Sequence, residues 1–328
     1  MAKISKKKLI DEYKEGELLD DIFVVKIRKT ISAASNGKYF FSLVLTDSSG
    51  KSIDYKYWGG HDENKVKTLY DSINDDSVIR IFGKVSPYNG KMQITSDEYQ
   101  MPKALMAAEY EAASFIKKTK KDIEQLHQQI QDAIDSIQDE KLKLLVQNVF
   151  NDDIKNKFKE HPAAISIHHN WIGGLLEHTL EVIRYCKLSK ELFPALNEDL
   201  LIVGALLHDI GKLEEMEMTT RIKGTNKGMF SGHLILGSIL LSKKMEEIDL
   251  GKELKDKLLH MIVSHHGKNE NGSPKEPMFP EAVALYYADE MSSKIAEMTE
   301  FISNNKEGTE DDFMPKWDKT RPTNIFLR

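Results

Sequence analysis

The period of the hydrophobic pattern changes near residue 100, and this change limits the fold of the 328-residue chain more than any other feature. Before that point, apolar residues form short runs rich in β-branched and aromatic side chains, with turn signals such as Asn36-Gly37 and Asn89-Gly90 between them. From about Pro102 onward, apolar residues recur at three- and four-residue spacing, which indicates helices. The sequence therefore predicts a multidomain protein in which an N-terminal β-barrel precedes an all-α domain.

The N-terminal pattern contains five candidate strands and one candidate helix. The strands are expected at 22–27, 39–45, 53–58, 78–85 and 91–94. The helix is expected at 63–73, between the third strand and the fourth. Five strands with a helix after the third is the order of elements in the OB-fold. In this order of elements, the segment resembles the OB domains of nucleic-acid-binding proteins.

Aromatic and basic side chains of the predicted barrel are candidates for binding nucleic acid, because OB-folds stack bases on aromatic rings beside cations. The candidates are Tyr55, Lys56, Tyr57, Trp58, Arg80 and Tyr88. Strand alternation places Tyr55 and Tyr57 on one face and the two residues Lys56 and Trp58 on the other. One of these pairs must therefore face the barrel core, and packing there is the alternative role for each aromatic residue.

Histidines are concentrated in the helical half. Nine of the 11 lie between His161 and His266, and histidine is both a metal ligand and a near-neutral acid–base group. Helices are expected at 171–188, at 199–208, from His233, at 254–266 and from Pro280. The candidate metal ligands on or beside them are His178, His208, Asp209, His233, His265, His266 and Asp289. Five helices can direct such side chains into one centre, where an aspartate next to a histidine can bridge two ions.

These motifs, with Leu206–Lys212 around the His-Asp pair, resemble the HD-domain metal-dependent phosphohydrolase superfamily. The additional His233 and His265-His266 resemble its two-metal subset. The order OB-fold then HD domain, with the segment Gly173–Thr179, is similar to the bacterial 3′-to-5′ exoribonucleases of the YhaM type. The resemblance implies that one metal is held by His178, His208, Asp209 and Asp289. A second metal would share Asp209 and add His233 and His265, with His266 as a further candidate.

Chemistry is also expected of these ligands and of residues that lie near them in the sequence. Imidazole and carboxylate ligands suit manganese, iron, zinc or cobalt, and manganese is the metal that the resemblance favours. Two close divalent ions lower the pKa of a water and offset phosphate charge. Lys212 is expected to contact a phosphate oxygen, and His169 or Glu177 is expected to assist proton transfer.

Composition limits the compartment and the class of partner. The single cysteine, Cys186, excludes an intramolecular disulfide and a thiolate zinc site, and it fits a reducing compartment. No apolar run reaches the ~18–20 residues of a membrane-spanning helix, so we expect a cytoplasmic protein. The formal net charge is −6, which does not indicate a strongly basic nucleic-acid clamp. The run Lys6-Lys7-Lys8 is expected to be a solvated tip, with a place in a basic groove as the alternative.

The sequence therefore leads to one domain plan and one preferred function. We expect an OB-fold nucleic-acid-binding domain at 1–100, a helical connector at 101–160, an HD domain at 161–303 and a tail at 304–328. The preferred function is metal-dependent 3′-to-5′ hydrolysis of single-stranded RNA, with single-stranded DNA as another substrate. The alternatives are a phosphohydrolase of small nucleotides and a nucleic-acid-binding module with an inactive HD site. Apolar surfaces in the connector and tail permit a homo-oligomer without demanding one.

Overall fold

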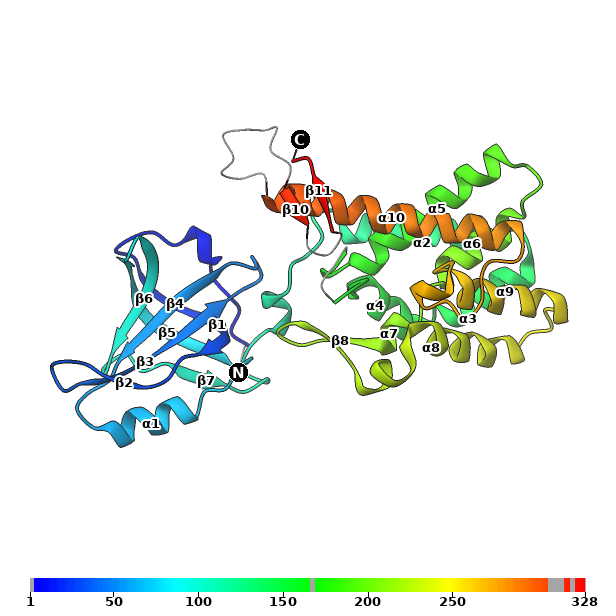
Figure 1. The fold of residues 1–328 in the computed structure, drawn as a ribbon. Helices are drawn as coiled ribbons and strands as arrows, with labels where there is room; N and C mark the ends of the chain where they lie inside the picture. Colours follow the sequence, from blue (N-terminus) through cyan, green and yellow to red (C-terminus); the bar gives the residue numbers. More distant parts are fainter. Residues whose placement is uncertain (1–2, 166–168, 306–315, 319–321, 328) are drawn as a thin grey trace. The chain divides into compact units, whose positions relative to one another are not determined.

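The computed structural model of the chain describes residues 3–165, 169–305, 316–318 and 322–327. These residues divide into two compact units (Figure 1). The first runs from the N-terminus to Lys117 and includes Met218–Arg221, and the second holds the remaining residues. None of the helices in the described ranges is long and apolar enough to cross a bilayer.

The first unit is built around a closed five-stranded barrel. Its strands are β1 (Leu18–Arg28), β3 (Tyr39–Thr46), β4 (Ser52–Trp58), β5 (Val78–Tyr88) and β6 (Lys91–Asp97). They pair in the order β1-β3-β4-β6-β5, and β5 pairs with β1 again to close the barrel. Helix α1 (Glu63–Asp71) follows β4, and the Asp62 side chain caps its first turn. The predicted order of five strands with a helix after the third is confirmed.

The segment that follows the barrel differs from the expected connector helix. The pattern predicts helix over residues 104–118, but β7 (Lys103–Leu105) adds to the edge of β5, and η2 (Ala112–Phe115) is a short 3₁₀ turn. The short β2 (Ser32–Ala33) extends β3 in the same way. An open strand edge offers unpaired backbone groups, and the Phe115 ring packs against Val24 and Val78. Long-range pairing therefore outweighs the local helical composition here.

The lysine run near the N-terminus is folded onto the barrel. The Lys6 side chain is 3% exposed, and its ammonium lies 2.7 Å from Asp21 Oδ2 and 3.8 Å from the Phe23 ring centroid. Asp21 also accepts hydrogen bonds from the Tyr13 hydroxyl and from the Lys7 backbone N–H. Burial lowers the pKa of Lys6. A buried charge needs such partners, so the expectation of a solvated tip is wrong for Lys6. The 3₁₀ turn η1 (Ile10–Glu12) continues this segment.

The second unit is helical, and its helices share one apolar core. They are α2 (Ile123–Asp135), α3 (Glu140–Val149), α4 (Asp152–Glu160), α5 (Gly174–Leu192), α6 (Glu198–Leu207), α7 (Lys212–Glu215), α8 (Asn226–Glu246), α9 (Lys252–Ser264) and α10 (Pro280–Asn305). Helix α6 is central: residues 200–207 are all buried, and the Asn197 side chain caps its first turn. It packs against α3, α5, α9 and α10.

Small irregular elements follow three of these helices, α7, α9 and α10. Strands β8 (Met216–Met218) and β9 (Ile222–Gly224) form a hairpin between α7 and α8, and η3 (Asn269–Asn271) follows α9. Strands β10 (Lys316–Asp318) and β11 (Thr323–Ile325) pair after α10. The expected tail at 304–328 lies partly outside the described residues.

Candidate metal centre and nucleic-acid surface

All seven predicted metal ligands come from helices or helix ends that meet in the second unit. His178 lies in α5, and Asp289 lies in α10. The other five follow helix ends or a break: His208 and Asp209 come after α6, His265 and His266 come after α9, and His233 follows Gly232 within α8. Gly232 has φ +68°, which interrupts α8, so the helix starts at Asn226 and restarts near His233 rather than beginning there as expected.

The first group of ligands surrounds His178 Nε2. This atom lies 3.2 Å from His208 Nε2 and 3.1 Å from Asp289 Oδ1. It also lies 3.4 Å from Asp209 Oδ2, which is 3.3 Å from His208 Nε2. These four side chains are the ones that the resemblance assigned to one metal.

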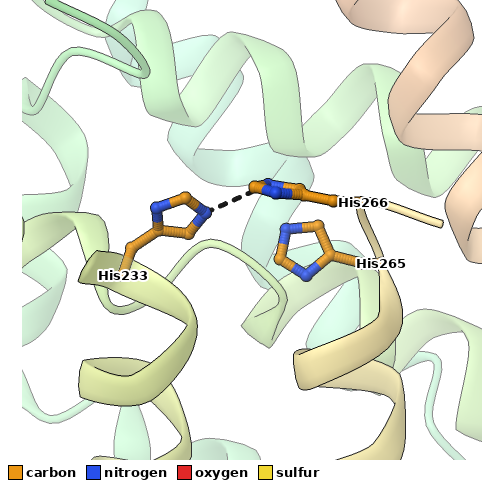
Figure 2. A group of neighbouring side chains, drawn as sticks. All are labelled: His233, His265 and His266. Atoms are coloured by element: carbon orange, nitrogen blue, oxygen red, sulfur yellow. Dashed lines mark hydrogen bonds between the residues drawn. The ribbon is translucent and has the colours of Figure 1, made fainter. Parts of the chain in front are cut away.

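The second group consists of three imidazoles. His233 Nε2 lies 3.2 Å from His266 Nε2, and the His265 ring lies beside them (Figure 2). Asp209 Oδ1 lies 3.6 Å from both His233 Nε2 and His265 Nε2. The two oxygens of Asp209 therefore face different groups, Oδ2 toward the first and Oδ1 toward the second. A carboxylate in this position can bridge two ions.

Hydrogen bonds at Nδ1 direct Nε2 atoms into the centre. A backbone carbonyl oxygen can only accept, so an imidazole that faces one with Nδ1 carries its proton there and leaves Nε2 as a lone pair. The Nδ1 partners are Ala205 O at 2.8 Å for His208, Ile262 O at 2.7 Å for His265 and Asn271 O at 3.2 Å for His266. These three imidazoles thus present the nitrogen that a metal ligand requires.

Two buried acceptors at the centre test whether a cation fits. Within the described residues, His265 Nε2 and Asp209 Oδ1 are buried and have no hydrogen-bond partner. Both atoms belong to side chains that are at most 3% exposed. Unpaired buried acceptors are costly, and convergent lone pairs repel one another unless a cation lies among them. The donor set therefore fits divalent transition metals with imidazole and carboxylate preference.

The charges of the centre are also consistent with a cation site. Burial lowers the pKa of His265 to about 3, so this imidazole is neutral and able to ligate near pH 7. Burial opposes ionisation of Asp209, but Lys212 and His208 hold the pKa of its carboxyl well below the ordinary value. Burial lowers the pKa of His178, and hydrogen bonds to Asp209 and Asp289 outweigh it and raise that pKa to about 9. These two carboxylates thus stabilise a positive charge at His178 Nε2, and a cation that binds there would replace that proton.

Comparison with known protein families identifies the second unit. A model of the HD domain matches residues 175–294, a range that includes all seven candidate ligands. The chain contains an HD domain. A model of the OB-fold nucleic acid binding domain (tRNA anti-codon type) matches residues 25–102, which lie in the barrel unit. The architecture is therefore an OB-fold domain followed by an HD domain, as the sequence predicts. HD domains bind divalent metals and belong to metal-dependent hydrolases.

Two solved structures show remote similarity. A murine DNA-binding protein bound with double-stranded DNA is 15% identical, with a TM-score of 0.23, over 36% of this chain and 52% of that chain. A replication protein A heterotrimer bound to single-stranded DNA contains a chain that is 15% identical, with a TM-score of 0.19, over 30% of this chain and 64% of that chain. The present chain thus spans about half to two thirds of the chains it matches.

The residues expected to assist the HD centre lie in its surroundings. Lys212 Nζ lies 2.7 Å from Asp209 Oδ2, so it neutralises the bridging carboxylate, and its contact with a phosphate stays a prediction. His169 is buried, and its Nε2 lies 3.3 Å from Glu181 Oε2. Glu181 accepts a hydrogen bond from Ser292 Oγ, which lies 3.0 Å from His178 Nδ1. His169 is therefore connected to a ligand through two residues that the sequence did not single out.

Those two residues carry a sequence signal. Glu181 follows His178 by three positions in α5, and Ser292 follows Asp289 by three in α10. Residues three apart in a helix share a face, so helical periodicity alone places them beside the ligands. Glu177, the alternative proton-transfer residue, lies 2.6 Å from Lys121 Nζ and accepts from Thr119 Oγ1.

Glu215 is another residue that sequence reasoning missed. Its Oε1 accepts from the His233 backbone N–H at 2.9 Å, and both carboxylate oxygens lie 3.0 Å from His233 Nδ1. Gly228 packs closely against this turn, because a Cβ there would lie 2.2 Å from the Glu215 carbonyl oxygen. Glu215 therefore fixes both the backbone and the ring of His233, in the arrangement by which carboxylates orient metal-binding imidazoles.

Replacing Glu215 with glutamine should weaken metal binding in the second group by about 10–100-fold, the usual effect of losing such a partner. Glutamine can still accept from the His233 N–H, so the fold should persist. Manganese titration calorimetry of metal-stripped protein measures the effect. Glu214→Gln is the matched control, because the Glu214 carboxylate pairs with Lys227 rather than with a ligand of the centre. Equal manganese affinity in the two variants would remove the positioning role of Glu215.

The structure shows which of the two residue pairs on β4 faces the barrel core and which faces outward. Tyr55 and Tyr57 are 0% and 3% exposed and belong to the barrel core, so the expectation that they stack bases is wrong. Lys56 and Trp58 point outward. Lys56 Nζ lies 4.1 Å from the Trp58 ring centroid and 3.9 Å from that of Phe40, a residue of the neighbouring strand β3. These three residues, named here the Trp58 surface, lie on the second and third barrel strands, the usual OB-fold contact face.

The two remaining candidates differ in their surroundings. Arg80 Nε and Nη2 donate to the two oxygens of Asp20 at 2.7 and 2.8 Å, so its charge is already paired. Its guanidinium also lies 4.7 Å from the Phe82 ring centroid. Tyr88 ends β5 beside the Asn89-Gly90 turn and is 60% exposed. Tyr88 is thus free to contact a strand, whereas Arg80 would have to exchange Asp20 for a phosphate.

Proposed function

We propose that this protein is a metal-dependent 3′-to-5′ exonuclease that hydrolyses phosphodiester bonds of single-stranded RNA, with single-stranded DNA as a second substrate. The observation that carries the proposal is the position of Asp209 among five imidazoles, with Oδ2 facing one group of candidate ligands and Oδ1 facing the other. This cluster lies in an HD domain that is preceded by an OB-fold. The direction of hydrolysis follows from the resemblance to the exoribonucleases described above.

The residues of the HD centre would have three roles: metal binding, neutralisation of charge and positioning of a ligand. His178, His208 and Asp289 would hold one ion, and His233, His265 and His266 would hold the other, with Asp209 between them. When bound, two divalent ions, manganese by preference, activate a water and offset the charge of the phosphate. Lys212 would add a positive charge beside the phosphate while it keeps Asp209 ionised. His169 would act through Glu181 and Ser292, as a positioning residue for His178.

The OB-fold would bind the single-stranded nucleic acid. The Trp58 surface offers an indole, a phenyl ring and an ammonium group on one face, which is the combination that binds bases and backbone phosphates of single strands. A phosphohydrolase of small nucleotides has no use for such a surface, which favours the nuclease over that alternative.

The deciding experiment is incubation of the intact protein with manganese and a 5′-labelled single-stranded RNA. A ladder of labelled products that shorten from the 3′ end supports the proposal. Release of phosphate from mononucleotides without a ladder would favour the small-nucleotide enzyme. Binding of the RNA without any hydrolysis would favour a binding module.

The same assay tests whether the Trp58 surface binds the RNA. Trp58→Ala should weaken the apparent affinity for the RNA by about 10–100-fold, because stacking contributes ~1–3 kcal/mol per base. Hydrolysis of a one-bond diester such as bis(p-nitrophenyl) phosphate should stay unchanged, because that substrate offers no base to stack. Trp317→Ala is the control, since Trp317 is an exposed tryptophan that lies in β10 of the other unit. Equal loss on both substrates would assign Trp58 a structural role.

A further inference from the structure

Helix α10 has an apolar outer face. Its inner face packs against α5, α6 and α9 and buries Ala282, Leu285, Ala288 and Ser292. Opposite this face, large apolar side chains remain exposed along most of the length of the helix. They are Val283 (39%), Tyr287 (58%), Met291 (45%), Ile295 (54%) and Met298 (41%), named here the α10 stripe.

The composition of this face is unusual for a surface that contacts water. Six positions between 281 and 298 are exposed, and the only charged one is Lys294. Isolated exposed apolar residues are common, but a continuous apolar stripe marks an interaction surface. At 1.5 Å per residue, the stripe extends over about 22 Å.

The spacing of the stripe makes it complementary to itself. Counted outward from Met291, Tyr287 and Ile295 lie four positions away on either side. Val283 and Met298 lie eight and seven positions away. An antiparallel copy of α10 therefore places Met291 opposite Met291 and Tyr287 opposite Ile295, as a two-fold interface requires.

The charges beside the stripe select the antiparallel arrangement. Glu290 and Lys294 lie on either side of Met291 in the sequence, and Lys294 Nζ lies 3.9 Å from Glu290 Oε1 of the same helix. Two antiparallel copies bring each Lys294 toward the Glu290 of the other copy, twice by symmetry. Two parallel copies in register would place the two Lys294 at one level and the two Glu290 at another, on opposite flanks of the interface, so this pairing of opposite charges would be absent. The stripes of two copies together expose on the order of 1,000 Å², which reaches the lower limit of a specific protein–protein interface.

We propose that the protein forms a homodimer in which α10 packs antiparallel against α10 of a second copy, with the two-fold axis at Met291. Asp289 lies in the same helix and points into the candidate metal centre, so the interface would stabilise the position of a helix that carries a candidate ligand. The proposal is independent of the chemistry assigned to the HD domain.

Cysteine cross-linking of the full chain tests the axis directly. The sole native cysteine, Cys186, is fully buried, so only an engineered thiol is available for oxidation. Met291→Cys should form a covalent dimer on a non-reducing gel, because the two copies of this position face each other. Met278→Cys, at a site that is 78% exposed and outside the stripe, should not. Val283→Cys and Met298→Cys should cross-link when mixed and not when alone.

The mass of the protein in solution provides a second test of the dimer. Wild-type protein at micromolar concentration should show twice the mass of one chain by light scattering, and Tyr287→Glu should raise the dimer dissociation constant at least tenfold. A monomeric wild type would overturn the proposal. So would a dimer that Tyr287→Glu leaves intact, or Met291→Cys cross-linking no faster than Met278→Cys.

Discussion

Substitution of Asp209 by asparagine should abolish both hydrolysis and metal retention. The asparagine side chain would keep the shape of the aspartate but lose the charge that faces the two ligand groups through Oδ1 and Oδ2. Charge stabilisation by bound metal contributes several kcal/mol to such reactions, so the rate should fall by about a thousandfold or more. Metal analysis of the purified protein and the RNA ladder assay measure the two losses separately.

The chain offers a matched control for this variant. Asp62 belongs to the other His-Asp pair of the sequence, and its side chain caps α1 in the barrel unit. Asp62→Asn should cost at most ~1 kcal/mol of stability and leave the metal content unchanged. If Asp209→Asn behaved like Asp62→Asn, with full metal and full activity, the centre would have to lie elsewhere.

Substitution of His233 by alanine should separate the two ligand groups. The first group keeps His178, His208, Asp209 and Asp289, whereas the second loses one of its three imidazoles. We expect the metal-to-protein ratio to fall from about two to about one and most turnover to be lost, because water activation and stabilisation of the leaving oxygen are divided between two ions.

The alternative role of His233 is to begin the second part of α8. In the structure, its backbone N–H is satisfied by Glu215, so that capping contact survives in His233→Ala. His260→Ala is the control: His260 lies in α9 outside the centre, and its Nε2 accepts from the Met278 backbone N–H. An unchanged metal ratio together with normal cleavage in His233→Ala would rule out the two-metal interpretation.

The sequence predicted those features that depend on local pattern. Hydrophobic period located the barrel strands and the helices α5, α6, α9 and α10 to within a few residues. The seven candidate ligands could be chosen because they stand on helices or at helix ends within a recognisable set, and their role as ligands stays a prediction. Strand alternation separated Tyr55 from Trp58, but it could not say which face is inside, because that depends on how the barrel closes.

Features that depend on distant partners could not be predicted. Residues 103–105 become a strand only because the edge of β5 is open to them. Lys6 is buried because Asp21, on another element, receives its charge. Glu215 orients His233 from across a hairpin, and no local spacing relates the two.

The Nδ1 partners of the ligands divide the centre into parts that differ in how they keep their order. His208 and His265 donate to carbonyls three residues earlier, Ala205 and Ile262, so each ring is aimed by the helix that carries it. His233 is aimed by Glu215 of α7, a helix of four residues. If α7 opened locally, His233 would therefore lose its orientation while the other two rings kept theirs. In hydrogen-exchange terms, the orientation of His233 depends on the opening of α7, whereas the orientations of His208 and His265 depend on the opening of α6 and α9.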